Sequence, residues 1–161
     1  MKFFSYLLFV LLLGFGSCSE DDNADAFCRN GSCSYEYFKN SQINITVISQ
    51  FGAFVEITGG SKQVFKRTYN YNDAPDIIDD ELTEILVFEL DKAKKSFSYS
   101  DENLAEANVL FGKLCYCPSG YNPVTSGTLE GKEISPGMWR IKANLQVENA
   151  VGPLTFDSIF N

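Results

Sequence analysis

One ten-residue stretch near the C-terminus constrains the fold of this chain more than any other feature. Between Met138 and Val147, apolar and polar side chains alternate without interruption. This period of two predicts an antiparallel strand about 33 Å long, with one face in a core and the other in water. The two faces are Trp139, Ile141, Ala143, Leu145 and Val147, against Arg140, Lys142, Asn144 and Gln146.

Several other segments also show strand patterns. Residues 42–47, 54–57 and 63–70 predict a three-stranded meander, with Gly59-Gly60 as a tight turn. Residues 85–90 are almost continuously apolar, as expected for a central strand covered on both faces. Further strands are expected at 97–99, 125–134 and 154–160, with turns at 92–95 and 149–153.

Residues 101–111 predict a short helix, because Asp101 can cap it and Leu104, Ala107 and Phe111 share a face. The alternative is a loop that runs into a strand at 109–114. Many short strands separated by turns indicate an all-β, mainly antiparallel fold. We expect a single β-sandwich or small β-barrel of about eight strands, with at most one or two short helices.

The N-terminus has the three-part layout of a secretory signal peptide. Lys2 supplies the positive end, residues 6–13 are unbroken apolar, and small residues follow. The apolar run is shorter than the roughly 20 residues that span a bilayer. We therefore predict a signal peptide at 1–17, an acidic flexible tether at 18–27 and a single β domain at 28–161.

Cys18 directly follows Gly16 and Ser17 and is followed by Ser19-Glu20-Asp21-Asp22. Within residues 1–22, this arrangement resembles the lipidated cysteine and acidic export signal of surface lipoproteins of the Bacteroidota. Phe15 departs from it, since the usual lipobox has Leu there. The resemblance implies lipid, such as palmitate, on Cys18 and an outer membrane protein exposed on the cell surface. The alternatives are the periplasmic leaflet, or ordinary signal-peptidase cleavage that releases a soluble protein.

The chain is acidic and has no histidine. Its net charge of −8 becomes −9 when Lys2 leaves with the signal peptide. This balance argues against nucleic acid and against adhesion to anionic lipid, so the predicted membrane attachment is the lipid itself. The missing histidine removes the commonest general base and transition-metal ligand. We predict no cofactor and no enzymatic activity.

The other cysteines are Cys28, Cys33, Cys115 and Cys117, an even set that predicts disulfides in an exported protein. Cys28 and Cys33 flank an Asn-Gly pair that can turn tightly enough for a local bridge. Cys115 and Cys117 on one strand would have Cα atoms about 6.6 Å apart, near the upper limit for a bridge. We therefore favour cross-links between the two pairs over two local bridges. A zinc site of all four cysteines is an alternative, but the spacing fits poorly.

Two groups of side chains are candidate binding sites. Tyrosines near predicted loops can stack on sugars or anchor a protein partner, and these are Tyr69, Tyr71, Tyr116 and Tyr121. The acidic loop offers weak calcium candidates, Asp73, Asp76, Asp79, Asp80 and Glu81, although a solvated loop is the favoured interpretation. Asp157-Ser158-Ile159 resembles the short O-glycosylation motif of exported Bacteroidota proteins.

These features together favour a non-catalytic binding module on the cell surface, with a glycan, peptide or protein partner. One alternative is a periplasm-facing structural or inhibitor lipoprotein. Another is a glycan hydrolase that uses carboxylates from the acidic loop at Asp79, Asp80 or Glu81.

Overall fold

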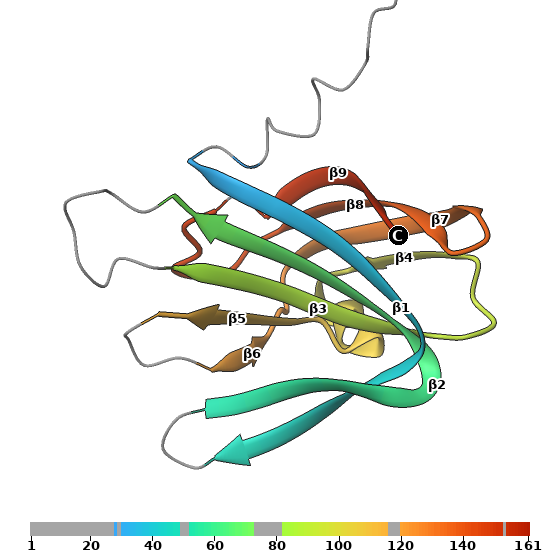
Figure 1. Cartoon of the computed structure of the whole chain (residues 1–161), viewed down its shortest axis with the longest axis horizontal. Helices are drawn as coiled ribbons and strands as arrows, with labels where there is room; N and C mark the ends of the chain where they lie inside the picture. Colours follow the sequence, from blue (N-terminus) through green and yellow to red (C-terminus); the bar gives the residue numbers. More distant parts are fainter. Residues whose placement is uncertain (1–27, 29, 49–51, 73–81, 116–119, 153) are drawn as a thin grey trace, which may run out of the picture.

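The computed structural model describes residues 28, 30–48, 52–72, 82–115, 120–152 and 154–161. Within them, strands and one short 3₁₀-helix form two antiparallel sheets that pack face to face (Figure 1). The expected all-β, mainly antiparallel fold is confirmed. The elements are β1 (Gly31–Ile48), β2 (Gly52–Tyr71), β3 (Thr83–Asp91), β4 (Ser96–Ser100), η2 (Asp101–Ala107), β5 (Leu110–Leu114), β6 (Tyr121–Pro123), β7 (Gly127–Ser135), β8 (Met138–Leu145) and β9 (Thr155–Phe160).

The larger sheet has the order β1-β2-β3-β5-β6 and curls on itself. Because β6 also pairs with β2, through Tyr121 and Ala53, the strands β2, β3, β5 and β6 form a closed circuit. The second sheet has the order β4-β7-β8-β9. The Tyr37 N–H donates to the carbonyl oxygen of Asn161 (3.1 Å), which joins β1 to the residue after β9. The fold is therefore a sandwich in which one sheet is partly closed.

Strand β8 carries the alternating pattern that the sequence predicted. Burial alternates along all of Met138–Leu145, and Trp139 and Ile141 are fully buried. Trp139 meets Phe65 of the larger sheet edge-on, with ring centroids 5.2 Å apart, and Phe65 stacks on Phe88 at 4.9 Å. These rings lie in the main core between the sheets.

Strand β3 is buried on both faces, as its apolar sequence predicted. Leu86 and Phe88 belong to the core between the two sheets. Val87 belongs to a second cluster, with Val64 and Leu110. The β1–β2 hairpin covers this second face, because it bends and passes over the curled sheet (Figure 1).

The predicted meander at 42–70 is wrong, since two long strands pair there instead and Gly59-Gly60 lies within β2. The strands bend where Asn40 has a left-handed φ of 54° and the register shifts after Lys39. A β-bulge of this kind bends a hairpin without ending it. Gly60 is required at the bend, because a Cβ there would lie 2.6 Å from the Gln42 side chain.

The predicted helix is present only as η2, which ends at Asn108 with a left-handed φ of 47°. The chain then enters β5, so the alternative of a strand within 109–114 also holds. Asp101 does not cap the helix. Ser100 is at the N-cap position, and the Asp101 carboxylate instead accepts the N–H of Gly127 (2.9 Å).

A buried carboxylate fixes the bent hairpin against β3. Glu89 is 6% exposed, and its Oε2 accepts the N–H of Ile43 (2.9 Å), shortly after the bulge. Its Oε1 accepts from Lys62 Nζ at 2.6 Å. A buried amide without a partner is costly, so Glu89 stabilises the path that β1 takes after the bend.

Replacing Glu89 with Ala should lower the free energy of unfolding by about 2–4 kcal/mol, because the Ile43 N–H and Lys62 lose their acceptor. Urea unfolding followed by Trp139 fluorescence measures this loss. The matched control is Glu36→Ala, since Glu36 pairs with Lys66 at the surface, and it should cost less than about 1 kcal/mol. Equal losses in the two variants would contradict a role for Glu89 at the bend.

Candidate functional site

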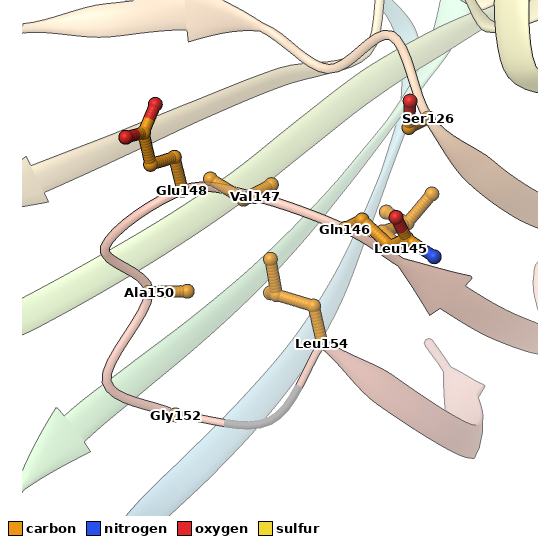
Figure 2. A pocket seen from close by; sticks show the side chains of 8 residues that line it. All are labelled: Ser126, Leu145, Gln146, Val147, Glu148, Ala150, Gly152 and Leu154. Atoms are coloured by element: carbon orange, nitrogen blue, oxygen red, sulfur yellow. The ribbon is translucent and has the colours of Figure 1, made fainter.

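The segment between β8 and β9 surrounds an open pocket of about 560 Å³ (Figure 2). Leu145 and Leu154 are buried at its base, and Leu154 points toward the centre of the loop. Gln146 and Glu148 are exposed at its edge. The other lining residues are Ser126, Val147, Ala150 and Gly152.

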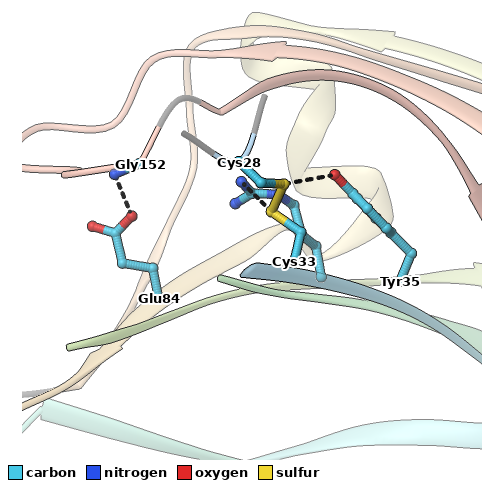
Figure 3. The surroundings of a disulfide bond; sticks show 6 residues. Cys28, Cys33, Tyr35, Glu84 and Gly152 are labelled. Carbon is cyan, nitrogen blue, oxygen red and sulfur yellow. Dashed lines mark hydrogen bonds between the residues drawn. A yellow bond between two sulfur atoms is a disulfide. The ribbon is translucent and has the colours of Figure 1, made fainter. Parts of the chain in front are cut away.

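A fully buried carboxylate on β3 holds this loop in place. Glu84 Oε1 accepts the N–H of Val151 (2.6 Å), and Oε2 accepts the N–H of Gly152 (2.8 Å; Figure 3). Lys113 Nζ lies 3.5 Å from Glu84 Oε1 and also donates to the carbonyl oxygen of Asn149. Hydrogen bonds to a charged group are stronger than neutral ones, so the pocket loop is anchored from beneath.

The loop also packs closely on a buried tyrosine. A Cβ at Gly152 would lie 2.8 Å from the Tyr69 ring and 3.1 Å from Glu84 Oε2, so only glycine fits there. The backbone of Gly31, at the start of β1, lies against the same ring. The start of the domain and the pocket loop are therefore neighbours at one end of the sandwich.

Cys28 and Cys33 form a disulfide, with Cα atoms 5.9 Å apart (Figure 3). This corrects the favoured cross-links from this segment to Cys115 and Cys117. The local bridge is possible because Asn30 has a left-handed φ of 61° and the Gly31 N–H donates to the Cys28 carbonyl oxygen (3.2 Å). That turn brings the two cysteines within the ordinary range for a bridge.

Of the other two cysteines, Cys115 is also disulfide-bonded, and Cys117 lies outside the described residues.

A buried cation lies beside the Cys28–Cys33 disulfide. The fully buried Arg67 donates from Nη2 toward Cys33 Sγ (3.4 Å) and lies over the Tyr69 and Phe156 rings. This arrangement fastens the first residues of the domain to both sheets.

The predicted tyrosine edge is not assembled. Tyr69 is 1% exposed, and burial raises the pKa of its phenol, so it is a core residue. Tyr69 lies on the same face of β2 as Phe65, which is buried. The sequence pattern alone did not show whether Tyr69 belonged to this buried face or to a loop at the strand end. Tyr71 is exposed at the last position of β2, whereas Tyr121 is on β6, with β3 and β5 between these two positions in the sheet. Burial also raises the pKa of Tyr121, and Tyr116 lies outside the described residues.

Several predicted sites fall on parts of the chain that the structure does not describe. These are Cys18, the export signal Ser19, Glu20, Asp21 and Asp22, and the calcium candidates Asp73, Asp76, Asp79, Asp80 and Glu81. Among the described residues, no group of His, Cys, Asp and Glu could hold a metal ion. In the same residues, no helix has the length and apolar character to cross a membrane.

The possible glycosylation site is not accessible in the folded domain. Ser158 is 9% exposed and its hydroxyl is buried within β9. The side chain that the Asp-Ser-Ile motif would present for modification therefore faces away from solvent. Asp157 and Ile159 point the other way, as the alternation of side chains along a strand requires.

No protein-family model, curated protein or solved structure matches this chain. The class of protein is therefore defined by the fold itself, an all-β sandwich with a partly closed sheet and a pocket at the segment between β8 and β9. The sequence predicts a turn at 149–153 but carries no signal of a function there. The turn residues carry no motif, and the buried Glu84 that shapes them is distant in the sequence.

Replacing Glu84 with Gln should loosen the pocket loop, because a neutral amide offers one acceptor oxygen to two N–H donors and removes the negative charge that pairs with Lys113. We expect hydrogen exchange at the Val151 and Gly152 amides to accelerate at least about fivefold. The control is Glu130→Gln on the exposed face of β7, which should leave both amides unchanged. Unchanged exchange in Glu84→Gln would contradict anchoring by this carboxylate.

Proposed function

We propose that this chain is a lipoprotein of the bacterial envelope whose β domain binds a ligand at the cell surface without catalysis. The main support for binding is the pocket loop between β8 and β9, which Glu84 and Lys113 hold in place. A binding site benefits from a shape that exists before the ligand arrives, because less conformational entropy is lost on binding. Glu84 and Lys113 provide that preorganisation by holding the backbone of Asn149, Val151 and Gly152 against β3 and β5.

The pocket chemistry favours a glycan among the candidate ligands. The accessible surface of the pocket is mainly polar, because Leu145 and Leu154 are buried at its base while Ser126, Gln146 and Glu148 place a hydroxyl, an amide and a carboxylate around it. A sugar ring carries several hydroxyl groups, which can exchange hydrogen bonds with these polar groups. The same groups could also hold a peptide, but a sugar uses all of them at once.

The N-terminal pattern supports the proposed location. Cys18 and Ser19-Glu20-Asp21-Asp22 have the order of a lipidated cysteine followed by an export signal. The first described residue is Cys28, so an extended tether would keep the domain within about 35 Å of the lipid. Without the leader the chain carries a net charge of −9, which disfavours attachment to anionic lipid, so the proposed anchor is lipid on Cys18.

Lipidation predicts that Cys18→Ser releases the protein from membranes, because the anchor is lost. Fractionation and mass spectrometry of the mature N-terminus measure this, and the native chain should start at an acylated Cys18. Protease added to intact cells should digest the native chain. An unmodified N-terminus would rule out the anchor, and protection from protease would indicate the periplasmic leaflet instead.

Binding at the pocket predicts that Gln146→Ala combined with Glu148→Gln weakens glycan binding about tenfold or more, through lost hydrogen bonds. A glycan array and titration calorimetry with the full chain identify the ligand and measure its Kd. Thr128→Ala combined with Glu130→Gln, on the exposed face of β7, is the matched control. Equal loss in both double variants would place the site elsewhere, and release of cleaved glycan would indicate a hydrolase.

A further inference from the structure

Most of the exposed large apolar side chains lie at one end of the domain. We call these residues the apolar rim. Val47 is 75% exposed, and the others lie between 37% and 54%. Isolated exposed apolar residues are ordinary, but a concentration at one end marks a surface that meets an apolar partner. The rim consists of Ile45, Val47, Phe54, Tyr71, Leu114 and Val151.

Strand register places the rim residues together. Leu114 pairs with Thr83. The preceding residue, Leu82, accepts the Tyr71 N–H at its carbonyl oxygen, so Leu114 and Tyr71 lie at the same end of the sheet. The end of the β1–β2 hairpin is joined to this part of the sheet through β6. Val47 pairs with Ala53, and Ala53 pairs with Tyr121. Tyr121 in turn pairs with Gly112, two residues before Leu114. Figure 1 shows these strand ends on the same side of the molecule as the start of β1.

Val151 reaches the same end through the pocket loop, since its N–H donates to Glu84 beside Thr83. The chain also enters the domain here. The Asn72 N–H donates to the Asn30 carbonyl oxygen (2.9 Å), and Gly31 pairs with Tyr71. The N-terminal tether therefore joins the fold on this side of the molecule, beside the Tyr71 edge of the rim (Figure 1).

We propose that the apolar rim rests on the membrane surface, at the boundary between lipid headgroups and acyl chains. This proposal rests on the lipid anchor at Cys18, because a tether of at most about 35 Å keeps this end close to the bilayer. An anchored domain samples the bilayer surface at high effective concentration, so a modest apolar contact suffices to orient it. The tether ends at the rim, which identifies the bilayer as the occupant.

The net charge favours an apolar contact over an electrostatic one. Without the leader the chain has a net charge of −9, which opposes approach to anionic headgroups, so apolar side chains must supply the attraction. The far end carries the β3–β4 turn, with Lys92 and Lys95 exposed. Buried Gln63 holds that turn by donating to the carbonyl oxygens of Asp91, Lys92 and Lys94. A fixed, charged turn of this kind remains in water.

A tryptophan placed in the rim tests the proposal directly. The sole native tryptophan, Trp139, is fully buried and gives a constant background. We would reconstitute lipidated Val47→Trp into phosphatidylcholine vesicles with brominated acyl chains, which quench nearby indoles. We expect a blue-shifted emission and quenching at least twofold greater than in Met138→Trp. Met138 is the matched control, because it is 37% exposed but lies on β8, away from the rim.

Flotation of the vesicles separates the two proposals. Chain that floats with unquenched Val47→Trp would overturn the rim contact and leave the anchor intact, whereas chain that does not float would overturn both. A blue shift before vesicles are added would show that the rim is already covered by protein, which also overturns the proposal. Val151→Trp, in the pocket loop, provides a second probe if Val47→Trp fails to fold.

Discussion

The bend in the β1–β2 hairpin is the constraint on which the rest of the structure depends. A straight hairpin of this length would extend beyond the sheet and leave its apolar side chains in water. The bulge at Asn40 turns both strands, and the far half of the hairpin then covers the outer face of β3. The same turn brings the start of β2 to β6, which closes the strand circuit through Ala53 and Tyr121.

Two carboxylates on β3 use the two faces that this bend creates. Glu84 faces the main core and accepts two amides from the β8–β9 loop, while Glu89 faces the hairpin and accepts the amide of Ile43. Both face buried surroundings, where an ionised group is stable only with donors around it. Glu84 finds its donors in the β8–β9 loop, and Glu89 accepts an N–H of β1 just after the bulge. The irregular segments and the buried charges therefore stabilise one another.

The sequence predicted those parts of the fold that depend on local alternation. Trp139 and Ile141 are buried where the pattern placed them, and β3 is covered on both faces. The predictions were wrong where one local sequence pattern is compatible with two different structures. A Gly-Gly pair suits a tight turn, but it equally suits a bend, and Gly60 is needed here for the approach of Gln42. Only the partner strand decides between these outcomes.

The candidate site was less predictable than the fold, for a related reason. Tyr69 was a reasonable surface tyrosine by its position near a loop, yet Gly31 and Gly152 close over its ring. The local disulfide depends on the left-handed backbone of Asn30. Asparagine permits this conformation but does not require it, so the residue type alone did not predict the bridge. Glu84 lies in an apolar strand, where its sequence neighbours give no sign of the loop it holds. Contacts between distant segments determined each of these features.

The two ends of the sandwich differ in a way that links location to binding. The disulfide, the Tyr69 ring and the pocket loop lie together where the tether enters, whereas the lysine turn lies at the other end. A ligand in the pocket of an anchored chain would therefore sit near the membrane rather than far outside the cell. That position favours a glycan that is itself attached to the envelope. A soluble glycan would be captured more readily by a pocket at the far end, so under the proposed function the placement of the pocket would restrict the class of ligand as its lining does.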